Sequence, residues 1–224
     1  MLINCKTMET FLVFKVSVLC LPPMKDKILD TATELFLNLG FKSVTMDDLA
    51  EEMGISKKTI YSHFGNKTDL VRQCTMNLFH KISDGINCIC EQGENPIVEL
   101  YEIKRFALMN LKNEKASPLY QLKKYYPQIH STLHKKQYEV VKDCVKTNIL
   151  RGIELGIYRK ELSVEFISRI YFAGMTSLKD DALFPRHEFP MVELMDHYLE
   201  YHLRAIVTPE GRKILNNLIN SNQD

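Results

Sequence analysis

The sequence lacks the short motifs that mark common catalytic sites. It has no glycine-rich phosphate loop, no nucleophile elbow and no HExxH pair. Two pairs at helical spacing could each share a metal ion, namely His130 with His134 and Glu193 with His197. Exposed side chains on a polar helix face are the simpler interpretation of both pairs. We therefore expect a protein that is not an enzyme and that needs no metal and no cofactor.

Glycine is scarce, and alternating runs of β-branched residues are rare. Only 9 of the 224 residues are glycine, and most of the chain repeats its apolar residues at helical spacing, so we expect an all-α protein. The contents of 45% hydrophobic and 25% charged residues fit an ordinary soluble globular protein. A net charge of +1 by itself favours neither nucleic acid nor membrane as a partner.

The six cysteines form no CxxC pair, which argues against the usual metal and redox motifs. Cys88 and Cys90 stand two residues apart and would fall on different sides of a helix. We expect reduced, mostly buried cysteines in a cytoplasmic protein, with a metal or redox role as the less favoured alternative. This interpretation covers Cys74, Cys88, Cys90 and Cys144.

The apolar run near the N-terminus is too short to span a bilayer. It covers Phe11–Leu21, is interrupted by a lysine and a serine, and is ended by Pro22–Pro23. Little positive charge precedes it and no clear cleavage site follows it, so it does not fit a signal peptide. We expect residues 1–23 to be a disordered extension, or a stretch upstream of a natural start at Met24, and we expect no membrane partner.

Residues 45–67, TMDDLAEEMGISKKTIYSHFGNK, predict two short helices joined by a tight turn and followed by a third helix. Thr45, with Asp48 three residues later, forms a carboxylate variant of the capping box. Gly54 stands where the first helix must end and the chain must reverse, a position that often needs a positive φ. Ser56 is placed to cap the second helix. This pattern is typical of a helix-turn-helix motif.

The second helix of this motif has a basic outer face. Between Ser56 and Lys67 the sequence contains three lysines and a histidine but neither aspartate nor glutamate. An ordinary helical hairpin with a solvated basic face is the alternative. The residues expected on the outward side are Lys57, Lys58, Thr59, Tyr61, Ser62 and His63.

A wider set of residues supports the helix-turn-helix motif over an ordinary helical hairpin. It consists of Ile28, Leu29, Ala32, Leu35, Phe36, Gly40 and Phe41, then Thr45, Met46, Asp48, Leu49 and Ala50, then Gly54, Ile55 and Ser56, and finally Thr59, Ile60, Tyr61, His63, Phe64, Asn66, Lys67 and Leu70. With these residues, the segment from Lys25 to about Leu70 resembles the DNA-binding domain of the TetR family of bacterial transcriptional regulators. The resemblance implies a three-helix DNA-binding domain at 24–70 and a larger helical effector-binding and dimerisation domain at 71–224.

The resemblance also implies a set of DNA contacts. Residues expected to reach base edges, or to lie beside them, are Lys57, Lys58, Thr59 and Ser62, with Ser56 at the helix start. Residues expected to contact phosphates are Thr45, Tyr61, His63 and Lys67. One departure is the charge of the domain: Lys25–Asp69 holds six lysines, no arginine and eight acidic residues. Affinity for double-stranded DNA must therefore depend on where the lysines lie.

The rest of the chain predicts further helices, and two of them are unusually apolar. Their expected ranges are 66–93, 97–112, 118–126, 127–155, 164–183, 190–207 and 209–220. The helices at 164–183 and 190–207 have apolar residues around most of their circumference, so they must be covered on more than one side. In the family such helices form a four-helix bundle between two subunits, whereas burial inside one subunit is the alternative. The resemblance thus implies a homodimer with Ile170, Ala173, Gly174, Ser177, Leu194, Tyr198 and Leu199 at the interface.

Aromatic and methionine residues are frequent on the middle helices, as expected for a small-molecule pocket with a few polar groups. Ordinary core packing is the alternative for each of them. The candidates for contact with an effector of unknown identity are Phe106, Met109, Tyr125, Tyr126, Tyr138, Tyr171 and Met175. The sequence therefore predicts a ligand-responsive transcriptional regulator, most often a repressor, that binds a near-palindromic operator as a dimer. The alternative is a helical adaptor that docks a protein and has no effector.

Overall fold

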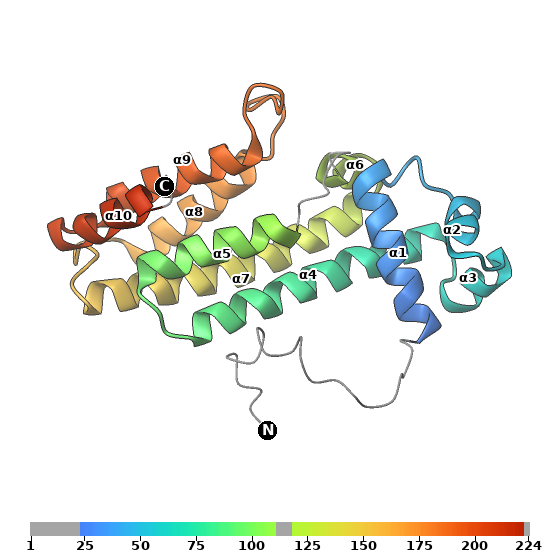
Figure 1. Cartoon of the computed structure of the whole chain (residues 1–224), viewed down its shortest axis with the longest axis horizontal. Coiled ribbons are helices and arrows are strands. Elements are labelled where there is room, and N and C mark those ends of the chain that lie inside the picture. The colour runs from blue at the N-terminus through green and yellow to red at the C-terminus, as the bar shows by residue number, and fades with distance from the viewer. Residues whose placement is uncertain (1–22, 111–117, 222–224) are drawn as a thin grey trace. The chain divides into compact units, whose positions relative to one another are not determined.

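The computed structural model describes residues 23–110 and 118–221, and within these ranges it contains ten helices and no strand beyond an isolated bridge between Tyr158 and Val207 (Figure 1). The all-α prediction is thereby confirmed. The helices are α1 (Met24–Leu39), α2 (Met46–Met53), α3 (Lys57–His63), α4 (Lys67–Glu91), α5 (Pro96–Asn110), α6 (Pro118–Tyr125), α7 (Pro127–Glu154), α8 (Val164–Ser177), α9 (Met191–Ile206) and α10 (Pro209–Ser221). The extension predicted at 1–23 lies outside the described residues, apart from residue 23. No helix in the described ranges is long and apolar enough to cross a bilayer.

The chain divides into two compact units. The N-terminal unit comprises the described residues up to Asp84 and within Asn110–Gln137, and the C-terminal unit comprises Gly85–Met109 and the described residues from Tyr138 onward. This division differs from the boundary predicted after residue 70. The reason is packing: three residues of α6 and α7 complete the core formed by α1, α2, α3 and the first part of α4. They are Leu122, Ile129 and Leu133.

Helix α3 is fixed in the N-terminal unit by its apolar inner side. Ile60 and Phe64 are fully buried, in the same cluster as Leu49 of α2 and Phe36 of α1. Burying such side chains stabilises the fold by roughly 1.5–3 kcal/mol each. Gly40 ends α1 with a φ of 87°, and a Cβ at this position would collide with the Gln121 side chain of α6.

The C-terminal unit contains a buried polar network as well as an apolar core. Glu99 of α5 is only 1% exposed, and its carboxylate accepts hydrogen bonds from Arg151 Nη1 at 2.5 Å and from Asn148 Nδ2 at 2.7 Å. The Asn148 amide also donates to the Pro96 carbonyl at 2.8 Å, and its oxygen accepts from the Tyr158 hydroxyl at 3.2 Å. The buried carboxylate is therefore both charge-paired and hydrogen-bonded, as a buried charge must be.

Helix α8 ends at Ser177, several residues before the predicted end at 183. The Asp180 carboxylate accepts a hydrogen bond from the Ala182 backbone at 3.0 Å, and the Asp181 carboxylate accepts one from the Arg186 backbone at 3.2 Å. Short acidic side chains that bond to nearby backbone amides favour turns over helix. The predicted continuation of the helix to 183 is therefore wrong.

The cysteines are reduced at three of the four positions considered. Cys74 is buried and free, and burial raises the pKa of its thiol to about 12. Cys90 and Cys144 are free and partly buried. Cys88 is disulfide-bonded, so the prediction of a reduced thiol is wrong there.

Candidate nucleic-acid interface

The turn between α2 and α3 has the local structure that the sequence predicts. The Thr45 hydroxyl accepts from the Asp48 backbone at 3.1 Å, and the Asp48 carboxylate accepts from the Thr45 backbone at 2.8 Å, which completes the capping box. Gly54 adopts the left-handed conformation with φ 62°. The backbone amides of Gly54 and Ile55 then reach back to the carbonyls of Glu51 and Ala50, which is a Schellman motif.

Hydroxyl groups fix the start of α3 and leave its outer side free for a partner. The Ser56 side chain accepts from the Thr59 backbone at 3.1 Å and lies 2.8 Å from the Thr59 hydroxyl. The Ser62 hydroxyl donates to the Thr59 carbonyl at 2.6 Å. Ser56 therefore acts as the N-cap of the helix, while each hydroxyl retains lone pairs for a ligand.

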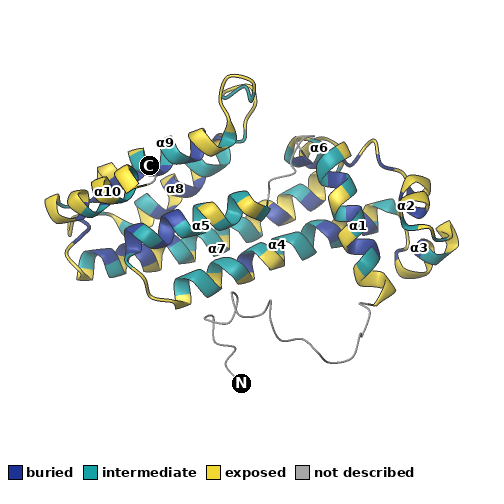
Figure 2. Cartoon of the chain, in the orientation of Figure 1, coloured by how far each residue is buried: buried dark blue, intermediate teal, exposed yellow. Residues whose placement is uncertain are grey.

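The predicted DNA-contacting residues lie on the surface, and Figure 2 shows α3 exposed over most of its outer side. The tyrosine among them is 44% exposed, so its ring and hydroxyl are open to a partner. Thr59 and Lys67 are half-buried. The exposed members of the set are Thr45, Ser56, Lys57, Lys58, Tyr61, Ser62 and His63.

Lys57 is not an unpaired cation, although α3 itself contains no acidic residue. Its ammonium donates to the Asp47 carboxylate of α2 at 2.7 Å, and this hydrogen bond raises the pKa of the lysine. For Lys58 no ion pair occurs in the described parts of the chain. Of the two adjacent lysines, Lys58 is therefore the one whose charge is available without breaking an existing contact.

Lys67 begins α4 beside the same face. Its ammonium donates to the Lys42 carbonyl at 3.4 Å, and burial lowers its pKa. Asn66 caps the helix by accepting from the Asp69 backbone at 2.9 Å. Because one of its three ammonium hydrogens is engaged, Lys67 is partly fixed in position and can offer the other two to a phosphate.

Lys25 is a candidate that the sequence analysis did not assign. It is exposed on the first turn of α1, and its ammonium lies 5.8 Å from the centre of the Phe64 ring, directly after α3. A cation over an aromatic face is attracted to the ring. This contact joins residues 39 positions apart, and no local pattern in the sequence indicates it.

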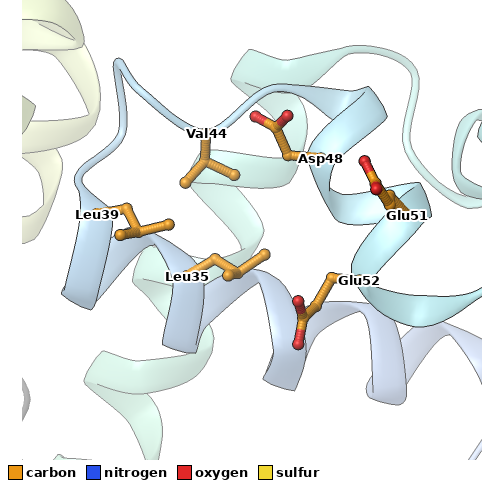
Figure 3. A pocket seen from close by; sticks show the side chains of 6 residues that line it. All are labelled: Leu35, Leu39, Val44, Asp48, Glu51 and Glu52. Atoms are coloured by element: carbon orange, nitrogen blue, oxygen red, sulfur yellow. The ribbon is translucent and has the colours of Figure 1, made fainter.

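A pocket of about 390 Å³ lies elsewhere in the N-terminal unit, between α1 and α2 (Figure 3). Leu35, Leu39 and Val44 form its apolar side. Three carboxylates line the other side and would repel phosphate groups. They are Asp48, Glu51 and Glu52. This pocket is therefore a poor candidate for a nucleic-acid contact, and none of the seven predicted effector residues lines it.

The predicted effector residues are divided between the two units. Tyr125 and Tyr126 belong to the N-terminal unit, and the other five belong to the C-terminal unit. Met109 is 60% exposed, whereas Tyr171 is buried in the core. The hydroxyl of Tyr138 is buried without a hydrogen-bond partner in the described structure, next to the ring of Phe172. The sequence pattern alone did not distinguish aromatic residues of the core from Tyr138, whose hydroxyl has no hydrogen-bond partner in the described structure.

The predicted dimer residues fall into three groups: buried, half-buried and exposed. Leu194 and Leu199 are buried in the core of their own chain, and we remove them from the predicted interface. Gly174 allows α9 to approach α8 closely, because a Cβ there would collide with Tyr198, whose hydroxyl donates to the Tyr171 carbonyl at 2.9 Å. The exposed group contains Ile170, Ala173 and Ser177, together with Phe166, Val192 and Tyr201, which the sequence analysis did not assign.

Comparison with known proteins agrees with this N-terminal geometry. Residues 28–74 match the family model for bacterial regulatory proteins of the tetR family. The chain is 38% identical over 61 residues to the biofilm operon icaADBC HTH-type negative transcriptional regulator IcaR of Staphylococcus epidermidis, which is 27% of this chain and 33% of that protein. It is 33% identical over 79 residues to IcaR of Staphylococcus aureus strain Newman, which is 35% of this chain and 42% of that protein. The alignments thus span less than half of these relatives.

Solved structures extend the similarity in fold to most of the chain. A putative transcriptional regulator from Saccharomonospora viridis in complex with choline has a TM-score of 0.70 at 20% identity, over 82% of this chain and 97% of that one. A TetR-family regulator from Agrobacterium tumefaciens has a TM-score of 0.67 at 18% identity, over the same shares. At these identities the likeness concerns the fold alone. Residues 28–74 thus match a tetR-family helix-turn-helix domain, and most of the chain shares the fold of these two solved structures.

Proposed function

We propose that this protein is a cytoplasmic transcriptional repressor that binds a near-palindromic operator as a homodimer and responds to a small-molecule effector. The observation that carries the proposal is the outer side of α3, where Lys58, Tyr61 and His63 are all exposed. The relatives that match the N-terminal domain are negative regulators, which favours repression over activation.

The shape of the motif explains how it would read DNA. A seven-residue helix such as α3 fits a major groove but reaches few base edges, so useful specificity requires two copies on two half-sites. We assign Lys58, Thr59 and Ser62 to contacts with bases, and Thr45, Tyr61 and His63 to contacts with the flanking phosphates. Lys57 would join them by exchanging Asp47 for a phosphate or a base edge.

The second copy would bind through the exposed apolar side chains of α8 and α9. Phe166 is 60% exposed, Ile170 48% and Tyr201 74%. Phe166, Ile170, Ala173 and Ser177 recur every three or four residues and therefore follow one side of α8. Large apolar side chains that follow one exposed helix face are typical of a protein interface.

An effector would bind in the C-terminal unit. The Tyr138 hydroxyl is a buried polar group beside the Phe172 ring without a hydrogen-bond partner in the described structure, and small-molecule sites use such polar groups to orient a ligand. Lys142 and Arg169 already lie 5.9 and 5.8 Å from its ring centre. This arrangement disfavours a cationic ligand at Tyr138, and we propose an uncharged or anionic effector with a hydrogen-bonding atom.

A gel-shift assay with the DNA that flanks its own gene, together with light scattering to measure mass, tests the proposal. We expect a dimer at micromolar concentration that shifts this DNA and not an unrelated duplex. A stable monomer that shifts neither duplex would instead favour the helical adaptor. The same assay in the presence of candidate effectors would identify the ligand by release of the DNA.

Replacing Lys67 with alanine should weaken binding to every sequence about equally, by roughly tenfold, and should reduce the salt slope by about one for each phosphate that the lysine neutralises. The measurement is a titration of affinity against salt concentration. Lys160→Ala provides a matched control, because Lys160 is exposed in the C-terminal unit. An unchanged salt slope would show that Lys67 does not bind a phosphate.

Replacing Lys58 with alanine should instead change sequence preference, by about 1–3 kcal/mol at the base pair it contacts. The measurement is the affinity for a panel of operators with single base-pair changes. Wild-type protein should discriminate at one symmetric pair of positions where the variant does not. If the variant binds every operator of the panel more weakly by the same factor, Lys58 contacts the DNA backbone and not a base.

A further inference from the structure

Two free cysteines lie unusually close together in the C-terminal unit. Cys90, in the last turn of α4, and Cys144, in the middle of α7, have their sulfur atoms 3.3 Å apart. The sulfur atoms of a disulfide are about 2.05 Å apart, so an approach of little more than 1 Å would join them. The two residues are 54 positions apart in the chain, so folding alone brings them together.

The surroundings of this pair give its two thiols different roles. The two thiols share a hydrogen bond in which either sulfur can be the donor, and this contact lowers the pKa of Cys90 and raises that of Cys144. The positive charge of Arg151 acts in the same direction on Cys90, against partial burial and the carboxylate of Glu99. The thiolate is the reactive form of cysteine. We therefore assign Cys90 as the nucleophile that reacts first, and Cys144 as the thiol that then attacks the oxidised Cys90.

We propose that Cys90 and Cys144 are a redox-active pair that a peroxide converts into a reversible disulfide between α4 and α7. In the first step, the Cys90 thiolate attacks one peroxide oxygen, forms a sulfenic acid and releases hydroxide. In the second, Cys144 attacks the Cys90 sulfur, and the sulfenic oxygen leaves as water. Overall, two thiols lose two protons and two electrons, and hydrogen peroxide becomes two molecules of water.

The position of the pair suggests what the disulfide would control. Helix α4 begins at Lys67, four residues after α3 ends, and continues without interruption to Cys90. A covalent link from its last turn to α7 would restrict how α4 can move. Resting on the function proposed above, we expect the oxidised protein to bind operator DNA with a different affinity from the reduced protein.

Another cysteine in the same protein provides an internal reference. Cys74 lies on α4 as well, but it is buried, and the pKa of its thiol is raised to about 12. A buried thiol of this kind is a poor nucleophile at neutral pH. Peroxide should therefore leave Cys74 unmodified under conditions that oxidise Cys90.

The first test needs no DNA. The reduced full-length protein is treated with an equimolar amount of hydrogen peroxide, and its peptides are mapped by mass spectrometry without reduction. We expect a Cys90–Cys144 linkage that a dithiol reductant reverses. Cys144→Ser should accumulate a sulfenic acid at Cys90, which a dimedone probe captures, whereas Cys90→Ser should give no probe adduct at Cys144. Oxidation that leaves Cys90 untouched, or that joins Cys90 mainly to another cysteine, would overturn the proposal.

The second test compares DNA affinity of the oxidised and reduced forms by gel shift. Wild-type protein should show a change of at least about fivefold, within the usual range of coupling between sites, and Cys90→Ser should show none. If the disulfide is mapped but the oxidised and reduced proteins bind DNA with equal affinity, the proposal that the disulfide regulates DNA binding is overturned. If the reduced protein shifts no operator, the proposed function itself fails, while the peptide map still decides whether the disulfide forms.

Discussion

Replacing Arg151 with alanine is expected to lower the free energy of unfolding by about 3–5 kcal/mol, because the change leaves a buried carboxylate without its cation. Glu99 is 1% exposed, and Arg151 Nη1 donates to it at 2.5 Å. The Arg151 side chain also donates to the Glu94 carbonyl. Urea unfolding followed by circular dichroism measures the change.

A double-mutant cycle separates the charge from the lost packing. Glu99→Gln combined with Arg151→Ala removes the unpaired charge and should recover part of the loss. Arg169→Ala is the surface control, since Arg169 pairs with Glu165 at 2.6 Å with both side chains more than half exposed. This control should cost less than about 1 kcal/mol. A loss of similar size in Arg151→Ala and the control would show that the network contributes no more than a surface ion pair.

Lowering the pH from 6.5 to about 4 is expected to reduce the free energy of unfolding through His202, by on the order of 3 kcal/mol. His202 is 5% exposed, its Nε2 has no hydrogen-bond partner in the described structure, and burial lowers its pKa to about 4. The unfolded chain takes up a proton near pH 6.5, whereas the folded chain does so only near pH 4. Between these values the unfolded state binds more protons, so stability rises with pH.

Phenylalanine at position 202 should remove this contribution, because it fits among aromatic neighbours and does not titrate. The His202 ring lies 4.8 Å from that of Tyr171 and 6.2 Å from that of Tyr198, measured between centroids. The difference in unfolding free energy between wild type and His202→Phe, measured at several pH values, isolates this residue from the carboxylates. His197→Gln, an exposed site on the same helix, is the control. A difference that stays constant between pH 4 and 6.5 would contradict the prediction.

The sequence predicted the helix-turn-helix motif in detail because its signals are local. Thr45 and Asp48 satisfy each other within one turn, Gly54 needs its positive φ at a single position, and Ser56 caps the helix that follows it. These effects depend on residues three or four positions apart, so a pattern of residue types is enough to identify them. The same holds for most of the helix boundaries.

Features that depend on contacts between distant residues could not be predicted in this way. The addition of Ile129 and Leu133 to the N-terminal core, the Lys57–Asp47 ion pair, and the pairing of Cys90 with Cys144 all require the fold. The apolar character of α9 led us to expect cover on more than one side, and within the chain its buried residues follow one side, from Leu194 to Ile206. Cover on a second side stays a prediction. The apolar character did not indicate which side chains pack within the chain, and Leu194 and Leu199 were therefore assigned to the wrong group.

The ion pair between Lys57 and Asp47 has a consequence for how such a protein would search a genome. A lysine already held by an acidic residue of its own domain attracts nucleic acid less than a free lysine does, because the ion pair must separate first. Both side chains are largely exposed, so the pair is weak, and a DNA phosphate or base edge could take the place of Asp47. In the function proposed above, Asp47 would compete with phosphates for Lys57 at every site, which would weaken binding to random sequence and leave more of the protein free to find its operator.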